Sequence, residues 1–259
     1  MTTLPITVSM ISGAEASRIG RALESVVGWT SEIVVVLNED ARDATAEIAR
    51  KFGAKVFPES WKGYVAQKAS AAQKATHEWV FGLDADEIVS PELRQEMEGL
   101  FSDKAALERF GAFSVPRLTM FCGRWIRHGD WYPDRTVRLW RKDRAEWGGV
   151  DPHAKLQVRG EVHKLSGNLL HHNAESIDRQ IAKITGFSSD FVQHMQATGR
   201  GSSWPNLVFR PMWRFARCYF FRLGFLDGWQ GYYIAWMTAF QTATRYAKLR
   251  EADSRADGR

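Results

Sequence analysis

Short apolar runs alternate with segments of helical spacing through the first hundred residues, and this alternation limits the possible folds more than any other feature. The runs 7–11, 32–37 and 79–83 are mostly apolar, and apolar residues recur at helical spacing over 45–52. Strands that alternate with helices predict a parallel sheet with right-handed crossovers. Such sheets bind ligands at the carboxyl ends of their strands. We therefore expect an α/β fold with a site at that edge.

The pattern changes in the second half of the chain. From residue 112 onward, four strand-like runs (AFSVPRLTMF, TVRLWR, AKLQV and NLLHH) are divided by turns. We expect them to extend the sheet with antiparallel strands, which makes it a mixed sheet. Residues 176–195 and 211–249 have helical patterns, the second broken around 224–231.

Cysteine content and hydropathy favour a protein of the cytosol. Cys122 and Cys218 are too few and too far apart for a disulfide framework. The first apolar stretch has no Lys or Arg before it and is too short for a signal peptide. The longest uncharged stretch, 228–244, is shorter than the roughly 20 residues that a spanning helix needs. We expect neither export nor a membrane-spanning helix.

The last quarter of the chain is basic and aromatic, within a net charge of +5. Arg210, Arg214 and Arg217 share one helical face, opposite Trp213 and Phe220. This pattern is typical of a helix that lies in the interface of an anionic bilayer. The alternative is a helix that packs on the core with its arginines in solvent.

Two carboxylates follow a buried-type strand in the segment WVFGLDADE. Asp84 and Asp86 are two residues apart, so in an extended conformation both point to one side. Carboxylate oxygens suit Mg²⁺ or Mn²⁺ bridged to a diphosphate. The alternative is a solvated acidic turn.

Several segments together resemble a known enzyme family. The first strand, EIVVVL with a loop ending in Asp43-Ala44-Thr45, and WVFGLDADE resemble the inverting family-2 glycosyltransferases of the GT-A fold. The branch that glycosylates lipopolysaccharide core or related envelope glycans is similar at Trp61-Lys62-Gly63-Tyr64, Gln67-Lys68, Pro133-Asp134, Arg138-Leu139-Trp140 and Leu170-His171. The resemblance implies a GT-A type, Rossmann-like mixed sheet flanked by helices, with C-terminal amphipathic helices. It also implies transfer of a hexose from a UDP-sugar to a lipid-linked saccharide.

The resemblance divides the chain into three parts. Residues 1–105 would bind the nucleotide-sugar, 106–175 would bind the acceptor and carry out catalysis, and 176–259 would form a helical region at the membrane surface. The enzyme would then act in the cytoplasm, at the inner face of the cell membrane.

Roles for individual residues also follow from the resemblance. Donor-binding roles fall to Ser12, Gly13, Glu15, Asn38, Lys68 and Asp84. Asn38 stands where the family usually has Asp, and its amide can still bond a base edge. Metal ligands would be Asp84, Asp86 and His171, with Mg²⁺ or Mn²⁺ as cofactor. As alternatives, Lys68 is an exposed helix lysine and His171 is structural.

An inverting transfer needs a group that takes the proton from the acceptor hydroxyl. The related enzymes have a His-Glu pair here, whereas this chain has His153-Ala154. Asp151 is the nearest remaining carboxylate, and His153 titrates in a useful range. We expect Asp151 and His153 to be the catalytic residues. The alternative is that Asp151 is a turn residue before Pro152.

Trp131, Asp134 and Arg135 combine an aromatic face with polar groups, as an acceptor sugar requires. Trp131 is an equally good packing anchor. Arg138 is expected to pair with a carboxylate or to contact a phosphate.

Two other functions remain open from the sequence. A nucleotidyltransferase can share such a sheet but would have a glycine-rich loop with a basic residue after the first strand, which Ser12-Gly13-Ala14-Glu15 does not supply. A non-catalytic basic module would bind nucleic acid or membrane. That function would explain the arginines but not the acidic segment around Asp84 and Asp86. Glycosyl transfer is the leading hypothesis, with a nucleotide-sugar, a lipid-linked glycan and an anionic membrane surface as partners and no nucleic acid.

Overall fold

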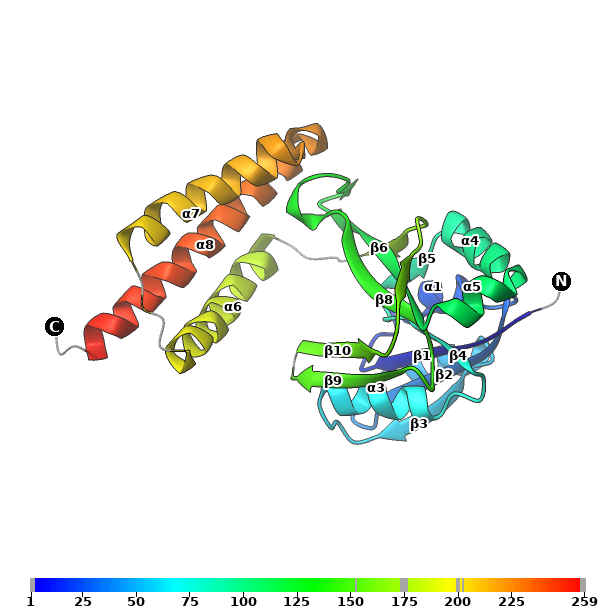
Figure 1. Ribbon diagram of the computed structural model, residues 1–259. Coiled ribbons are helices and arrows are strands. Elements are labelled where there is room, and N and C mark those ends of the chain that lie inside the picture. Colours follow the sequence, from blue (N-terminus) through cyan, green and yellow to red (C-terminus); the bar gives the residue numbers. More distant parts are fainter. Residues whose placement is uncertain (1–2, 152, 173–176, 199–200, 202, 257–259) are drawn as a thin grey trace. The chain divides into compact units, whose positions relative to one another are not determined.

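The computed structural model describes residues 3–151, 153–172, 177–198, 201 and 203–256 (Figure 1). The chain forms two compact units. One contains Met1–Arg117 with Arg135–His172, and the other contains Leu118–Asp134 with Asn173–Arg259. The three-part division expected from the sequence stays a prediction.

A mixed sheet is the centre of the first unit. Its strands run in the order β3-β2-β1-β4-β8-β6-β12-β5, and β11 and β7 also pair with β6. The four parallel strands are β1 (Leu4–Ser12), β2 (Thr30–Asn38), β3 (Lys55–Glu59) and β4 (Trp79–Gly82). The other strands are β5 (Glu87–Val89), β6 (Ala112–Phe121), β8 (Asp134–Arg141), β11 (Val162–Lys164) and β12 (Leu169–His171). The short strand β7 (Arg124–Trp125), which pairs with the end of β6, belongs to the second unit. The expected α/β fold with a mixed sheet is confirmed.

Helices cover both faces of this sheet. They are α1 (Ile19–Glu24), α2 (Thr45–Lys51), α3 (Tyr64–Gln73), α4 (Pro91–Ser102) and α5 (Lys104–Arg109). Residues of α1, α2, α4 and α5 join one apolar core with alternate residues of β1, and α3 belongs to a smaller core around Trp140. Ser90 Oγ accepts a hydrogen bond from the Leu93 amide, which caps α4 at its start.

The strands β9 (Ala145–Val150) and β10 (His153–Val158) form a separate antiparallel pair. The expectation that the run AKLQV extends the main sheet is therefore wrong. Trp147 and Leu156 of this pair pack on the core around Trp140, and the pair contacts α3 (Figure 1). Burial of these side chains over a face of the sheet explains why β10 does not lie at its edge.

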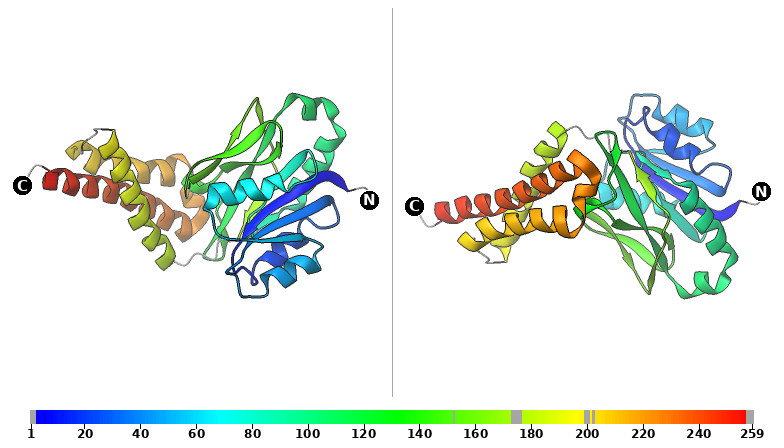
Figure 2. Two further views of the ribbon diagram at one scale, coloured as in Figure 1. Left: turned by 90° about the horizontal axis from the view of Figure 1, so that it is seen from below. Right: turned by 90° about the horizontal axis from the view of Figure 1, so that it is seen from above.

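The second unit is largely helical. Its helices are η1 (Gly129–Trp131), α6 (Ile177–Ala197), α7 (Trp204–Ala216), η2 (Arg217–Phe221), η3 (Gly224–Asp227) and α8 (Gly228–Ala256). Both views of Figure 2 show α6 and α7 lying against α8, and these contacts hold the unit together. None of the described helices has both the length and the apolarity that crossing a bilayer requires.

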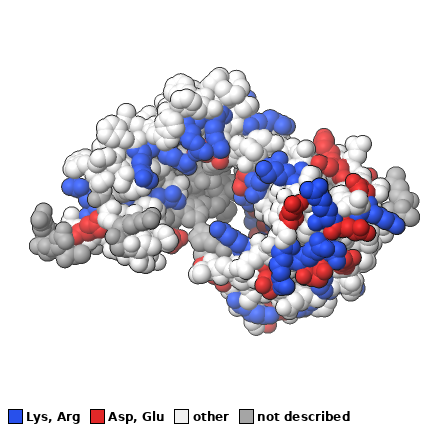
Figure 3. All heavy atoms as spheres, in the orientation of Figure 1, with Lys and Arg blue, Asp and Glu red and all other residues white. Residues whose placement is uncertain are grey.

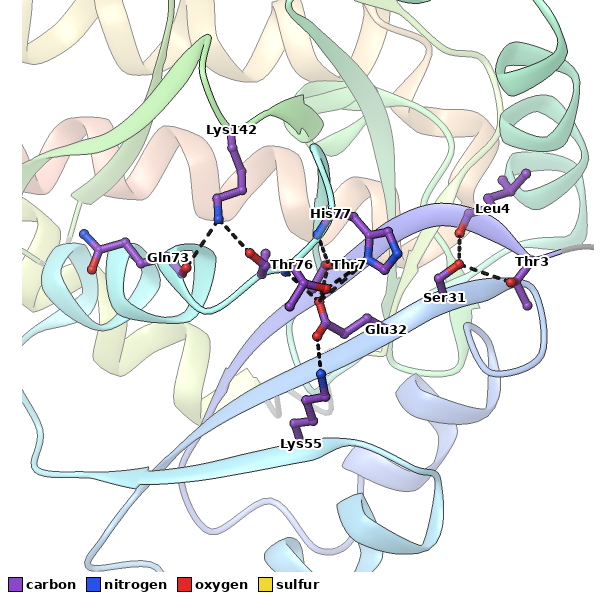
Figure 4. Close-up of polar contacts among 11 residues, drawn as sticks. Thr3, Leu4, Thr7, Ser31, Glu32, Lys55, Gln73, Thr76, His77 and Lys142 are labelled. Carbon is purple, nitrogen blue, oxygen red and sulfur yellow. Dashed lines mark hydrogen bonds and ion pairs between the residues drawn. The ribbon is translucent and has the colours of Figure 1, made fainter.

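A buried carboxylate joins the parallel strands at the edge opposite their carboxyl ends (Figure 4). Glu32, at the start of β2, accepts hydrogen bonds from Thr7 Oγ1 at 2.5 Å, Lys55 Nζ at 2.7 Å and the Thr76 amide at 2.8 Å. Burial raises the pKa of Glu32, but these hydrogen bonds outweigh it and lower the pKa from 4.5 to about 2. The charged form of Glu32 therefore stabilises the fold.

Replacement of Glu32 by Gln is expected to lower the free energy of unfolding by about 2 kcal/mol at pH 7. This is less than the full pKa shift implies, because Lys55 is more than half exposed and solvent screens its charge. The folded pKa lies below the unfolded value, so the contribution is present above pH 4.5 and is lost as the pH falls towards 2. Urea unfolding from pH 7 to pH 3 measures it. A difference between the two proteins that stays constant with pH would contradict this assignment, and Glu24→Gln, at an exposed position of α1, is the control.

Candidate active site

The acidic segment forms a turn at the carboxyl end of β4. The Asp84 carbonyl accepts a hydrogen bond from the Glu87 amide at 3.0 Å, and the Glu87 carboxylate accepts one from the Asp84 amide at 3.1 Å. The extended conformation expected here is wrong, because these two hydrogen bonds close a turn. The turn begins where β4 leaves the sheet, so both aspartates remain at the predicted edge.

Asp84 is held by two cations. Arg138 Nη2 lies 2.7 Å from Asp84 Oδ2, and Lys68 Nζ lies 3.0 Å from Asp84 Oδ1. Burial raises the pKa of Asp84, but the charges of Arg138 and Lys68 outweigh it and hold the pKa far below its usual range. Asp84 is thus a fixed carboxylate, and Lys68 is not the exposed helix lysine of the alternative interpretation, since its side chain is 19% exposed.

Glu87 completes this ion network beneath the turn. Its carboxylate is fully buried and lies 2.5 Å from Arg138 Nη2. Burial raises the pKa of Glu87, and the charge of Arg138 acts in the opposite direction. Arg138 is itself nearly fully buried and bridges both carboxylates. The expectation that Arg138 pairs with a carboxylate is confirmed.

Asp86 faces His171 across a strand pairing. In the antiparallel ladder of β12 and β5, His171 is the partner of Glu87, and the His172 amide donates to the Asp86 carbonyl at 2.9 Å. This register places His171 Nε2 3.3 Å from Asp86 Oδ2, with Arg18 Nη1 3.9 Å from the same oxygen. Burial raises the pKa of Asp86, but the hydrogen bond and charge of His171 outweigh it and lower the pKa.

Asp86 and His171 together fit one side of a divalent cation site. Within the described part of the chain, no group of three or more His, Cys, Asp or Glu side chains is arranged to hold a metal. Mg²⁺ commonly takes only one or two carboxylates from the protein and completes its shell with substrate phosphates and water. The pair therefore fits a metal that a donor diphosphate also ligates. Asp84 fits this role less well, because Arg138 and Lys68 already occupy both of its oxygens.

The other predicted donor residues lie at the ends of β1 and β2. Ser12 is the last residue of β1, and Gly13 has open space where a side chain would begin. Asn38 ends β2, and its Oδ1 accepts from the Asp40 amide at 3.2 Å. Glu15 forms an ion pair with Arg18, in which Oε2 and Nη2 are 2.6 Å apart. Their roles in donor binding stay predictions.

Sequence reasoning missed three residues around the turn, namely Arg18, Glu87 and Trp147. Trp147 is a neighbour of Lys68, whose Nζ lies 5.1 Å from the indole ring centre. Lys68, Asp84, Arg138 and Trp147 line one small cavity at this edge of the sheet. Arg138 Nε and Trp147 Nε1 are buried and have no hydrogen-bond partner in the described part of the chain. A ligand oxygen would provide the acceptor that such donors require.

Asp151, between strands β9 and β10, lies against the first turn of helix α3. Its Oδ1 accepts a hydrogen bond from the Val65 amide at 2.9 Å, so it caps the helix. A side chain at Gly63 would collide with Asp151 Oδ2, which explains the glycine there together with its φ of +89°. The backbone of His153 pairs with Val150, and its side chain lies outside the described part of the structure. Catalytic roles for both residues stay predictions.

The candidate acceptor residues belong to different units. Trp131 packs on Phe121 in the second unit, with ring centres 5.4 Å apart, as a packing anchor would. Asp134 is half-buried in the same unit. Arg135, in the first unit, donates to the Leu165 carbonyl at 2.8 Å. Acceptor binding by these residues stays a prediction.

The sequence of the chain matches a family of known proteins. The model of Glycosyl transferase family 2 matches residues 7–159. An uncharacterized glycosyltransferase of Rickettsia typhi is 31% identical over 95% of this chain and 87% of its own length. The lipopolysaccharide core biosynthesis glycosyltransferase LpsC of Rhizobium meliloti is 26% identical over 94% of each chain.

Among solved structures, TarS of S. aureus in complex with UDP-GlcNAc superposes with a TM-score of 0.49 and 12% identity, over 99% of this chain and 93% of its own. Glucosyl-3-phosphoglycerate synthase of Mycobacterium tuberculosis gives a TM-score of 0.44 and 12% identity, over 76% of this chain and 81% of its own. The family match and the mixed sheet flanked by helices agree with the GT-A type that the resemblance implied. Because the family match covers more than half of the chain and the rickettsial relative aligns along nearly all of it, the chain belongs to glycosyltransferase family 2.

Proposed function

We propose that this chain is a metal-dependent, inverting glycosyltransferase that moves a hexose from a UDP-sugar to a hydroxyl of a lipid-linked saccharide such as lipopolysaccharide core. One observation carries the proposal: the Asp86–His171 pair lies beside a carboxylate, Asp84, that two cations hold ionised. The kinship with LpsC, which is named for lipopolysaccharide core biosynthesis, supports the class of acceptor. Family membership counts against a nucleotidyltransferase and against a non-catalytic module.

The donor would bind along the turn. Asp84, fixed by Arg138, would accept hydrogen bonds from ribose hydroxyls, and Lys68 would counter the charge of the diphosphate. Asp86 and His171 would hold Mg²⁺ or Mn²⁺. When bound, this cation would offset the negative charge that develops on the leaving diphosphate. Ser12, Gly13, Glu15 and Asn38 would surround the nucleoside.

The acceptor side needs a base. Asp151 Oδ1 already accepts from the Val65 amide, whereas Oδ2 lies against Gly63. We propose that the Asp151 carboxylate takes the proton from the acceptor hydroxyl, with His153 two residues later in the chain. Trp131, Asp134 and Arg135 remain the proposed acceptor contacts. The enzyme would act in the cytoplasm, at the inner face of the cell membrane.

Thermal unfolding with nucleotides tests the donor assignment. At about 100 times the dissociation constant, UDP with Mn²⁺ is expected to raise Tm by about 5 °C or more, and GDP by less. In Asp86→Asn the part of the shift that depends on Mn²⁺ is expected to vanish, whereas Glu24→Gln should behave as the wild type. If neither nucleotide raises Tm with or without metal, the proposed donor is wrong.

A further inference from the structure

The second unit exposes a large set of apolar side chains along α7, α8 and the turn between them, which spans residues 217–227. Of the twenty exposed large apolar side chains in the described residues, fourteen lie between Trp204 and Phe240. Soluble monomers rarely expose a contiguous apolar patch of more than a few hundred Å². We call this set the aromatic face; its members are Trp204, Val208, Phe209, Met212, Trp213, Phe220, Phe221, Leu223, Phe225, Leu226, Trp229, Tyr232, Trp236 and Phe240.

Ring contacts make the aromatic face continuous from one helix to the other. The ring centres of Trp213 and Phe221 are 5.4 Å apart, which joins α7 to the turn. The ring centre of half-buried Phe215 lies 6.3 Å from that of Phe220 and 4.9 Å from that of Trp236. These contacts join the turn to α8. These ring contacts connect α7, the turn and α8 through Trp213, Phe221, Phe220 and Trp236.

The two helices present these residues in helical register. On α8, exposed aromatic residues recur every three or four positions at Trp229, Tyr232, Trp236 and Phe240. Ile234 and Ala235, on the other side of α8, are buried in the core of the unit. The core is thus complete without the aromatic face, which remains available for another partner.

Positive charge adjoins this apolar surface. Residues 201–250 include seven Lys or Arg and one acidic residue, Asp227, which is buried and bound to His128. Arg214, Arg217 and Arg222 lie 3.1, 2.9 and 3.4 Å from the single carboxylate of Asp130.

One carboxylate cannot neutralise three guanidinium groups, and these arginines keep 32 to 42% of their side chains exposed. In Figure 3 the basic side chains along α7 form a band beside an uncharged surface. The arginines thus face Asp130 in part, rather than solvent or lipid alone as the sequence suggested.

We propose that the aromatic face inserts into the interfacial layer of an anionic bilayer, with Arg222 and Arg214 at its margin against lipid phosphates. Trp side chains favour this layer, since the ring is apolar and its N–H stays hydrated. The excess of positive charge favours anionic lipid and opposes a second copy of the same face. In this arrangement α7 and α8 would lie along the interface, with the aromatic face turned towards the acyl chains. This inference deepens the membrane location proposed above, and its test needs neither donor nor acceptor.

Flotation with lipid vesicles tests the insertion. The full chain is mixed with vesicles of phosphatidylcholine with phosphatidylglycerol, or of phosphatidylcholine alone, in 0.1 M and 1 M NaCl. The test variant is Phe209→Ser, Met212→Ser, Phe221→Ser, at positions that are 66, 64 and 69% exposed. Its matched control is Val162→Ser, Ile181→Ser, at exposed apolar positions outside the aromatic face. Circular dichroism and Tm establish that each variant folds.

The expected result is binding to anionic vesicles that persists in 1 M NaCl, because salt screens charge attraction but not apolar burial. The test variant should bind at least tenfold more weakly, and the control as the wild type does. Brominated acyl chains should quench tryptophan fluorescence in the wild type. Equal binding by the test variant, or wild-type binding abolished by 1 M NaCl, would overturn insertion. A dimer in light scattering that the test variant abolishes, without vesicle binding, would assign the face to a second copy instead.

Discussion

Replacement of Arg138 by Met is expected to lower the free energy of unfolding by about 3–5 kcal/mol. Arg138 is buried and is the cation 2.5 Å from the fully buried carboxylate of Glu87. Without it, the buried Glu87 carboxylate keeps Arg117 as a cationic neighbour, but at 3.8 Å and with 32% of the Arg117 side chain exposed to solvent, so most of the compensation of its charge is lost. The charge of Asp84 is destabilised less, because Asp84 keeps its ion pair with Lys68 and 31% of its side chain is exposed to solvent. Urea unfolding at pH 7 measures the loss.

The double variant Arg138→Met, Glu87→Gln separates a stranded charge from lost packing. Removal of both partners of a buried ion pair is often close to neutral, so the second change should restore most of the stability. If the double variant is as unstable as Arg138→Met alone, the stranded-charge explanation is wrong and packing around Arg138 is the cause.

Asp151→Asn is expected to reduce the rate of sugar transfer by a factor of about 10² to 10⁴ while leaving stability nearly unchanged. Asn accepts a hydrogen bond from the Val65 amide as Asp does, and caps helices about as well. It cannot take a proton from the acceptor. The measurement is kcat together with Tm for the same preparation.

The matched variant Asp151→Ala removes both roles. It should lose about 1 kcal/mol of stability through the cap and fall to the same low rate as Asp151→Asn. A fully active Asp151→Asn would show that this carboxylate is only a helix cap. The base would then lie elsewhere in the chain.

The sequence predicted the parts of the fold that depend on local patterns. Strand β4 and the position of Asp84 and Asp86 at its end follow from an apolar run that stops at two carboxylates. Both features are set by residues close together in the chain, so periodicity was sufficient.

Contacts between distant residues were the ones that sequence reasoning missed or left open. His171 meets Asp86 because β12 pairs with β5 in one register, and short strands with few residues do not fix such a register by pattern. Arg214 of α7 and Arg217 of η2 meet Asp130, more than 80 residues earlier in the chain. The strands β9 and β10 form a separate pair, and Trp147 of β9 packs on the core around Trp140. Helical and strand periodicities carry no information on these pairings.

Crystals soaked in Mn²⁺ and UDP show whether a cation binds at the Asp86–His171 pair, since manganese gives an anomalous signal. We expect one peak ligated by Asp86 and His171 and by oxygens of the diphosphate, with Lys68 beside the nucleotide. Bound UDP without a manganese peak at the Asp86–His171 pair, or manganese bound elsewhere, would contradict it.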